Sequence, residues 1–178
     1  MPTEIEAKLK VDSLSEVEHK LGELGARFLG EQLQTDYMFD DVNATLTKTD
    51  QCLRLRKQIV GKRESFFLTY KGAKEKSLLK KRQEIESEIN DADSIHKLLL
   101  ALGYEQVLIV EKKRRLWLFC NCEVALDQLP LLGDFVEIEG PDEENISNVQ
   151  NSLGLTDLPH ISKSYASLLK EQLQQSDK

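Results

Sequence analysis

The stretch TEIEAKL at residues 3–9 alternates polar or charged residues with apolar ones. Because successive side chains of a β-strand point to opposite faces, this alternation predicts a strand with one charged and one apolar face. The charged face carries Glu4, Glu6 and Lys8, which lie about 7 Å apart at two-residue steps along a strand. Carboxylates and an ammonium at this spacing can hold a divalent metal ion and an anion bound to it. A half-buried strand with a solvated charged face has the same pattern. One strand alone therefore does not distinguish a binding face from a solvated face.

The same alternation recurs further along the chain, between segments with helical spacing. Strands are predicted at 34–40, 51–58, 64–71, 80–89, 105–119, 123–127 and 133–139. Helices are predicted at 13–25, 91–102, 141–153 and 162–173, and a polar loop that is ordered only in part at 41–50. The charged strand faces together carry Glu4, Glu6, Lys8, Arg54, Arg56, Lys71, Arg82, Glu84, Glu86, Lys112, Arg114, Glu123, Asp127, Glu137 and Glu139.

These elements fit an α+β domain built on a large antiparallel sheet. An open sheet would turn the charged face to water, whereas a closed barrel would turn it inward and leave the apolar face for the helices to cover. Alternation alone does not distinguish an open sheet from a closed barrel. A closed interior needs its charges paired or occupied. It would suit a polyanion held by arginines together with a metal held by carboxylates, or else a network of structural ion pairs.

Composition limits the other classes of function. The length of 178 residues fits a single domain, which we expect over residues 1–173 with a frayed C-terminal tail at 174–178. The net charge of −7 argues against a general nucleic-acid surface. We expect no membrane span, because no apolar run reaches roughly 18 residues. Cys52, Cys120 and Cys122 are expected as reduced thiols of a cytoplasmic protein, since no export signal is visible.

Taken in order, these segments resemble the CYTH family, or triphosphate tunnel metalloenzymes, which includes class IV adenylyl cyclases, inorganic triphosphatases and thiamine triphosphatases. Glu4, Glu6 and Lys8 match the opening Glu-x-Glu-x-Lys signature. Matching segments follow at 36–40, 53–56, 68–72, 82–86, 111–114, 126–127, 132–139 and 163–165. The resemblance spans about residues 3–170 and is greatest to the class IV cyclase branch.

The resemblance implies an eight-stranded antiparallel β-barrel with a hydrophilic, charged interior, covered outside by about four helices. It implies a metal-dependent enzyme acting on a triphosphate, with conversion of ATP to cyclic AMP and pyrophosphate as the preferred reaction. The alternatives are hydrolysis of inorganic or thiamine triphosphate to orthophosphate, and a non-catalytic module that binds nucleotides or polyphosphate. Expected partners are small-molecule triphosphates, without nucleic acid or membrane, and a homodimer is one option for assembly.

The resemblance also assigns roles to residues. The ligands of Mg²⁺ or Mn²⁺ would be Glu4, Glu6, Asp127, Glu137 and Glu139. The triphosphate would be bound by Lys8, Arg54, Arg56, Lys71, Arg82, Arg114 and Lys163. Lys8 and Lys71 would be the catalytic residues, and Glu84 and Glu86 would pair with these cations or bind a second metal.

One position departs from the family pattern. The middle of the Asp-aromatic-Asp strand is usually Tyr, and here it is Met38, while Tyr37 should face the other side of the strand. A tyrosine at that position assists hydrolysis in some triphosphatases, so Met38 disfavours that mechanism. Base recognition would separate a cyclase from a triphosphatase, and no decisive adenine-binding signature is visible in the sequence.

Overall fold

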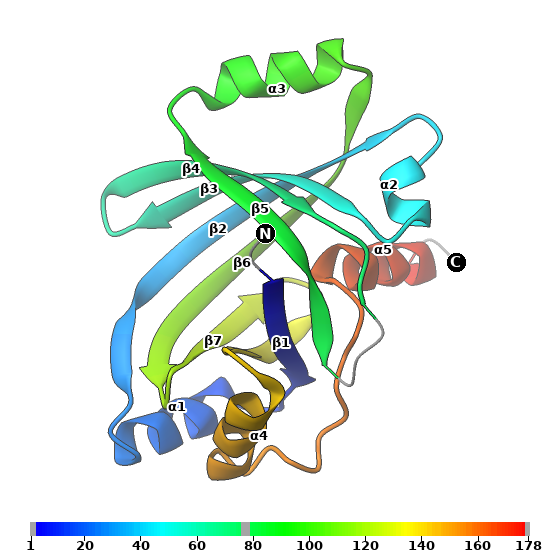
Figure 1. Ribbon diagram of the computed structural model, residues 1–178. Coiled ribbons are helices and arrows are strands. Elements are labelled where there is room, and N and C mark those ends of the chain that lie inside the picture. Colours follow the sequence, from blue (N-terminus) through cyan, green and yellow to red (C-terminus); the bar gives the residue numbers. More distant parts are fainter. Residues whose placement is uncertain (1–2, 76–78, 177–178) are drawn as a thin grey trace.

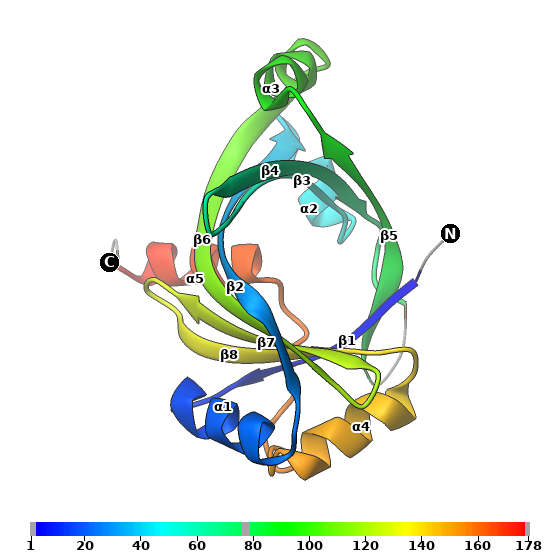
Figure 2. The same ribbon diagram turned by 90° about the vertical axis from the view of Figure 1, so that its left-hand side faces the viewer.

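The computed structural model describes residues 3–75 and 79–176 of the chain. Within them, eight strands form a closed antiparallel barrel in the order β1-β5-β4-β3-β2-β6-β7-β8, which confirms the predicted barrel (Figures 1 and 2). The strands are β1 (Thr3–Lys10), β2 (Arg27–Asp41), β3 (Cys52–Val60), β4 (Arg63–Lys71), β5 (Lys80–Ile89), β6 (Tyr104–Phe119), β7 (Cys122–Leu129) and β8 (Gly133–Glu139).

The first strand closes the barrel, because β1 pairs with β5 on one side and with β8 on the other. Glu6 lies opposite Lys80 of β5 and opposite Glu139 of β8. Lys8 lies opposite Glu137. The alternation that begins at residue 3 therefore places its charged face inside the barrel, next to the charged faces of two strands that come much later in the chain.

The second strand is longer than predicted, since β2 begins at Arg27 rather than at residue 34. It pairs with β6 from Arg27 opposite Leu118 to Asp41 opposite Tyr104. The register shifts beside Gly30, which has a φ of 141° that disfavours other residues. This irregularity is a β-bulge, and it breaks the period-two pattern on which the shorter prediction rested.

Five helices accompany the described strands, one more than the expected four. They are α1 (Leu14–Glu23), α2 (Thr45–Lys48), α3 (Ala92–Ala101), α4 (Glu143–Ser152) and α5 (Tyr165–Ser176). The extra helix, α2, lies in the segment predicted as a partly ordered loop. It is held by the carboxylate of Asp40, which accepts hydrogen bonds from the backbone N–H groups of Leu46 and Thr47, both at 2.9 Å.

The last helix is also shifted toward the C-terminus, since α5 runs to Ser176 and includes three residues of the predicted tail. Residues 177 and 178 lie outside the described residues. The division into one domain at 1–173 and a tail stays a prediction.

None of the described helices combines the length and the apolar character that crossing a membrane requires. The three cysteines form no disulfide.

The main hydrophobic core lies outside the barrel rather than within it. Helices α1 and α4 cover the outer faces of β1, β7 and β8 (Figure 2). Leu9, Val124, Leu126, Val136 and Ile138 of these strands are fully buried there. Burial of apolar surface contributes about 25 cal/mol per Å² to folding, so this outer layer stabilises the barrel and leaves its interior for polar side chains.

Candidate active site in the barrel interior

The barrel encloses a cavity of about 540 Å³, within the range of roughly 300–1,000 Å³ that is usual for small-molecule sites. Every strand contributes at least one charged side chain to its lining. These are Glu4, Glu6, Lys8, Asp36, Arg54, Arg56, Lys71, Lys80, Arg82, Glu84, Glu86, Lys112, Arg114, Glu123, Glu137 and Glu139. The predicted hydrophilic interior is therefore present, with both signs of charge facing one enclosed space.

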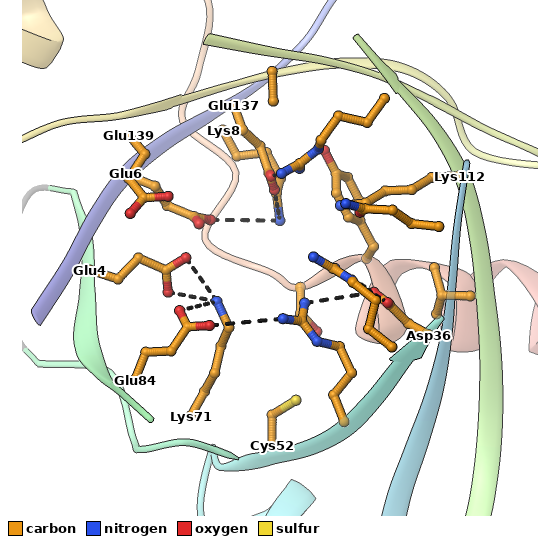
Figure 3. Close-up of a pocket in the computed structure, with 18 of the residues that line it drawn as sticks. Glu4, Glu6, Lys8, Asp36, Cys52, Lys71, Glu84, Lys112, Glu137 and Glu139 are labelled. Atoms are coloured by element: carbon orange, nitrogen blue, oxygen red, sulfur yellow. Dashed lines mark hydrogen bonds and ion pairs between the residues drawn. The ribbon is translucent and has the colours of Figure 1, made fainter. Parts of the chain in front are cut away.

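Carboxylates gather where β1 meets β8. Glu6 and Glu139 are directly opposite each other in the register, and Figure 3 shows both beside Glu4. Within the described chain Glu139 makes no ion pair. Partial burial, followed by the negative charges of Glu4, Glu6 and Glu123, raises the pKa of Glu139 to about 7. We call Glu4, Glu6 and Glu139 the acidic cluster, and its negative charge is only partly neutralised.

Two lysines neutralise part of this acidic cluster. Lys71 Nζ lies 2.8 and 2.7 Å from the carboxylate oxygens of Glu4, and 2.7 Å from Glu84. Lys80 Nζ lies 2.5 Å from Glu6 Oε1. With these ion pairs in place, no three acidic, histidine or cysteine side chains among the described residues converge in the geometry of a metal site.

The donor chemistry of the acidic cluster nevertheless fits a hard divalent cation, which prefers carboxylate oxygens. Lys71 and Lys80 already place positive charge against Glu4 and Glu6. Burial and the negative charges of Glu4 and Glu6 raise the pKa of Glu139, and no cation among the described residues pairs with it. A divalent ion at this position would replace lysine contacts and relieve the repulsion that holds the proton on Glu139.

Lys8 of β1 and Glu137 of β8 lie opposite each other, two residues along their strands from Glu6 and Glu139. Lys8 Nζ lies 3.2 Å from Glu137 Oε1 and donates to the carbonyl oxygen of Lys163 at 3.1 Å. Burial lowers the pKa of Lys8, although Glu137 opposes the shift. Glu137 also contacts Arg114, and the cations around it hold its pKa well below the usual range despite burial. Glu137 is thus more fully neutralised than Glu139.

The structure places Asp127 away from the acidic cluster with which the resemblance grouped it. Asp127 is fully buried and does not line the cavity. Its carboxylate accepts two hydrogen bonds from Arg114, at 2.7 and 2.6 Å, and one from the Tyr165 hydroxyl at 2.9 Å. Lys112 lies 3.3 Å away. In this arrangement Asp127 holds two cations and a phenol, and it has little capacity left for a metal.

Three arginines and a buried aspartate also line the cavity. Asp36, Arg54 and Arg56 come from β2 and β3, whereas Arg82 of β5 lies opposite Glu4 of the acidic cluster. Arg56 donates two hydrogen bonds to Asp36, at 2.6 and 2.8 Å. Arg54 donates to Thr69 at 3.0 Å and to Glu86 at 3.2 Å. The Nε groups of Arg54 and Arg82 are buried without a hydrogen-bond partner among the described residues. Both arginines therefore have donors available for the oxygens of an anion.

Lys163 is the predicted triphosphate ligand that the structure does not bring into the cavity. Its Nζ lies 2.7 and 2.8 Å from the carboxylate oxygens of Glu171, on the exposed side of α5. Only its backbone carbonyl takes part in the site, as the acceptor for Lys8. Glu84 and Glu86 line the cavity and pair with Lys71 and Arg54 respectively.

Sequence reasoning gave no role in the site to three residues, Lys80, Lys112 and Tyr165. Lys112 was placed on a charged strand face without a role, and Lys80 stands two positions before Arg82, so the same alternation could have found it. Burial and the neighbouring Arg114 lower the pKa of Lys112 to about 7. The centroid of the Tyr165 ring lies 4.0 Å from Lys8 Nζ and 4.9 Å from Lys112 Nζ. No sequence pattern indicates that one aromatic ring will contact two lysine ammonium groups.

Comparison with known proteins gives a family-level match. Residues 2–165 match the model of the CYTH domain family. A curated protein of Methanocaldococcus jannaschii, provisionally named an adenylate cyclase, is 32% identical over 136 residues, which cover 76% of this chain and 75% of the relative.

Solved structures share the fold. A protein from Pyrococcus horikoshii OT3 is 30% identical, with a TM-score of 0.83 over 95% of this chain and 99% of that chain. A protein from Hippeastrum is 16% identical, with a TM-score of 0.70 over 94% of this chain and 95% of that chain. It is described as a provisional adenylyl cyclase with a dominant triphosphatase activity, and at this identity the likeness extends to the fold alone.

Proposed function

The chain belongs to the CYTH family, and from this premise we propose that it converts ATP to cyclic AMP and pyrophosphate inside the barrel. Family membership implies an enzyme that acts on triphosphates and depends on a divalent metal. The choice of the cyclase reaction is supported by the provisional name of the archaeal relative and by the overall resemblance to the class IV branch.

One observation carries the proposal: a single cavity presents both an acidic cluster and two arginines, Arg54 and Arg82, whose Nε groups have no hydrogen-bond partner among the described residues. A triphosphate is a polyanion that travels with a divalent cation, so it needs both kinds of group at once. A tunnel that bound only an anion would have no use for Glu139, which no cation of the described chain neutralises.

Glu4, Glu6 and Glu139 are the residues that would hold the metal, with Glu137 next to them and Asp127 behind Arg114. Mg²⁺ and Mn²⁺ both suit carboxylate ligands. A metal bound there supplies Lewis-acid activation of the attacking hydroxyl and neutralisation of phosphate charge. Lys71 and Lys80 are then free to turn from the carboxylates toward the phosphates.

The chain's own cations position the triphosphate and stabilise the charge that develops during transfer. The Nε groups of Arg54 and Arg82 have no hydrogen-bond partner among the described residues, and Arg56 and Arg114 are fixed by bidentate pairs. Lys8 and Lys71 both line the cavity and would act as the catalytic cations. Phosphoryl transfer depends chiefly on such positioning and charge stabilisation, which is why this lining suits it.

The second candidate is hydrolysis of inorganic or thiamine triphosphate. The activity described for the Hippeastrum protein favours it, since the same charged tunnel serves either reaction. Met38 weighs against a tyrosine-assisted hydrolysis, because Met38 lines the cavity while Tyr37 packs on the outer side of β2. The Tyr165 hydroxyl is not free to take that part, because it already donates a hydrogen bond to the carboxylate of Asp127.

Product analysis tests the proposal. The purified protein is incubated with Mg²⁺ or Mn²⁺ and, separately, with ATP, inorganic triphosphate and thiamine triphosphate. Cyclic AMP and pyrophosphate from ATP would support the cyclase. Orthophosphate without a cyclic product would replace it by the triphosphatase, and no product from any substrate would favour a non-catalytic binding module.

A further inference from the structure

One part of the cavity wall is polar but uncharged. Gln32 and Gln34 of β2 and Gln58 of β3 all line the cavity. Gln34 is 3% exposed. Its Nε2 group donates one hydrogen bond to Gln32 Oε1 at 2.7 Å and another to Gln58 Oε1 at 2.9 Å. Both amide hydrogens of Gln34 are therefore used, and the three side chains form one connected unit that we call the glutamine cluster.

The glutamine cluster leaves one buried acceptor unused. Gln34 Oε1 has no hydrogen-bond partner among the described residues. A buried carbonyl oxygen without a donor lowers folding stability, because the group has lost its hydrogen bonds to water. The amide groups of Gln32 and Gln58 keep their own N–H donors, since only their oxygens are engaged by Gln34. The cluster thus presents an acceptor flanked by donors.

This arrangement lies next to the groups proposed to bind the triphosphate. Gln34 is opposite Lys112 and Gln32 is opposite Arg114 on β6. Gln58 follows Arg56 by two residues on the same face of β3, about 7 Å along the strand. Leu116 and Ala125 add apolar surface to the same lining. A group joined to the triphosphate by a short linker can therefore reach the glutamine cluster.

Phosphate oxygens do not suit this position, because they are acceptors and would face another acceptor at Gln34 Oε1. A flat, neutral group with an N–H donor beside a ring acceptor does suit it. We propose that Gln32, Gln34 and Gln58 form a nucleobase subsite, in which Gln34 Oε1 accepts a hydrogen bond from the exocyclic amine of an adenine-type base. This inference rests on the proposed function, since it assigns the base of the triphosphate substrate bound in the same cavity.

Ligand pairs that differ in one amine test the subsite. The first is α,β-methylene ATP, which cannot be cyclised, and the second is the same analogue of purine riboside triphosphate, which lacks the 6-amine. Inorganic tripolyphosphate is the third ligand. Each is titrated calorimetrically with Mg²⁺ into the full chain. We expect the adenine compound to bind about tenfold or more tightly than the purine compound, because the purine leaves Gln34 Oε1 unpaired.

The variant Gln34→Leu should bring the two base analogues to within about twofold of each other and leave tripolyphosphate binding nearly unchanged. Gln128→Leu is the matched control, because Gln128 is exposed on the outer face of β7, and it should retain the wild-type preference. The wild-type comparison requires no variant to fold.

Each outcome has a separate meaning. Equal wild-type binding of the adenine and purine compounds would overturn the subsite while leaving the proposed function intact. An adenine preference that survives in Gln34→Leu would also overturn it, since the amine would then be recognised elsewhere. Failure of all three ligands, tripolyphosphate included, to bind the wild type would overturn the proposed function and the subsite with it.

Discussion

The two sides of the barrel are stabilised in different ways. The packed wall, β1, β7 and β8, lies beneath α1 and α4, and its outward-facing Val124, Leu126 and Ile138 are fully buried. The thin wall, β3, β4 and β5, is covered only in part by α3. Its outward-facing Ile85 is 50% exposed and Tyr70 is 37% exposed. Side chains of both walls line the same cavity.

The difference shows where the fold can tolerate unfavourable charge. The packed wall holds Glu6 opposite Glu139, an arrangement of like charges that costs free energy. Its outer core offsets this cost. On the thin wall opposite charges face each other, with Lys71 2.7 Å from Glu84 and Arg54 3.2 Å from Glu86. We infer that the packed wall presents the metal ligands and that its outer core makes up for the like charges on its inner face.

The largest effect on stability is expected from Asp127→Asn on the packed wall. This change leaves the buried Arg114 and Lys112 without their shared carboxylate, so the free energy of unfolding should fall by about 3–5 kcal/mol. Asp36→Asn is the matched variant beside the thin wall and removes the bidentate partner of Arg56. It should cost less, because Asp127 is more deeply buried and also accepts from the Tyr165 hydroxyl and pairs with Lys112. Urea denaturation of both variants measures the difference, and an equal or larger cost for Asp36→Asn would break the comparison.

The outer faces should also differ. Leu126→Ala removes a fully buried side chain from the core under α1 and α4, so unfolding free energy should fall by about 2–5 kcal/mol. Ile85→Ala, on the exposed outer face of β5, should change it by about 0.5 kcal/mol. Chemical denaturation gives both values, and similar losses would show that the outer face of β5 at Ile85 is packed as tightly as that of β7 at Leu126.

Turnover should separate the carboxylates of the two walls. Glu6→Gln removes a proposed metal ligand, and metal-dependent turnover should fall at least about 100-fold, or about 2.7 kcal/mol in transition-state free energy. Glu86→Gln on the thin wall should cost less than about tenfold, because Glu86 only pairs with Arg54 and Thr69. Initial rates at saturating Mn²⁺ test this, with thermal unfolding as the check on folding. Equal losses would give Glu86 a place at the metal.

The smallest effect concerns pH. Lys112 has a pKa of about 7, and a bound polyanion should favour its charged form. The affinity for tripolyphosphate should therefore fall about tenfold between pH 6 and pH 8. Lys112→Arg keeps its charge throughout and should lack this part of the decline in calorimetric titrations.

Stability responds to Lys112 with the opposite sign. The unfolded chain keeps the proton up to the ordinary value of 10.5 while the folded chain releases it near 7. The unfolded state therefore binds more protons between these values, and the contribution of Lys112 to stability rises with pH across this range.

The binding experiment has its own contradicting outcome. An identical pH profile of tripolyphosphate affinity in wild type and Lys112→Arg would show that Lys112 does not titrate between pH 6 and pH 8.

Much of the barrel could be predicted because strand alternation survives wherever one face is apolar and the other charged. It placed β5 and β8 at their observed bounds. The alternation fails at Gly30, where a bulge interrupts the pattern and the N-terminal half of β2 was missed. It also fails in α2, because the helix depends on hydrogen bonds to the Asp40 carboxylate rather than on apolar spacing.

The sequence predicted most of the charged residues that line the cavity. It did not predict which cation pairs with which carboxylate. Period two places Lys8, Arg54 and Asp127 on the charged faces of their strands, and the resemblance turns these faces inward and adds roles. Which cation neutralises which carboxylate depends on the order of the strands around the barrel, and this order brings β1 beside β8. Glu6 therefore lies opposite Glu139 and Lys8 lies opposite Glu137, and no local pattern encodes these pairings between strands far apart in the sequence.

Native-state hydrogen exchange, resolved by strand, tests the division between the two walls most directly. In the free protein we expect the amides of β3, β4 and β5 to exchange faster than those of β7 and β8, because fewer buried apolar side chains support them. Adding tripolyphosphate with Mg²⁺ should slow exchange chiefly in the thin wall, whose arginines and lysines would bind the ligand. Equal exchange in both walls of the free protein, or protection confined to β7 and β8, would contradict this division.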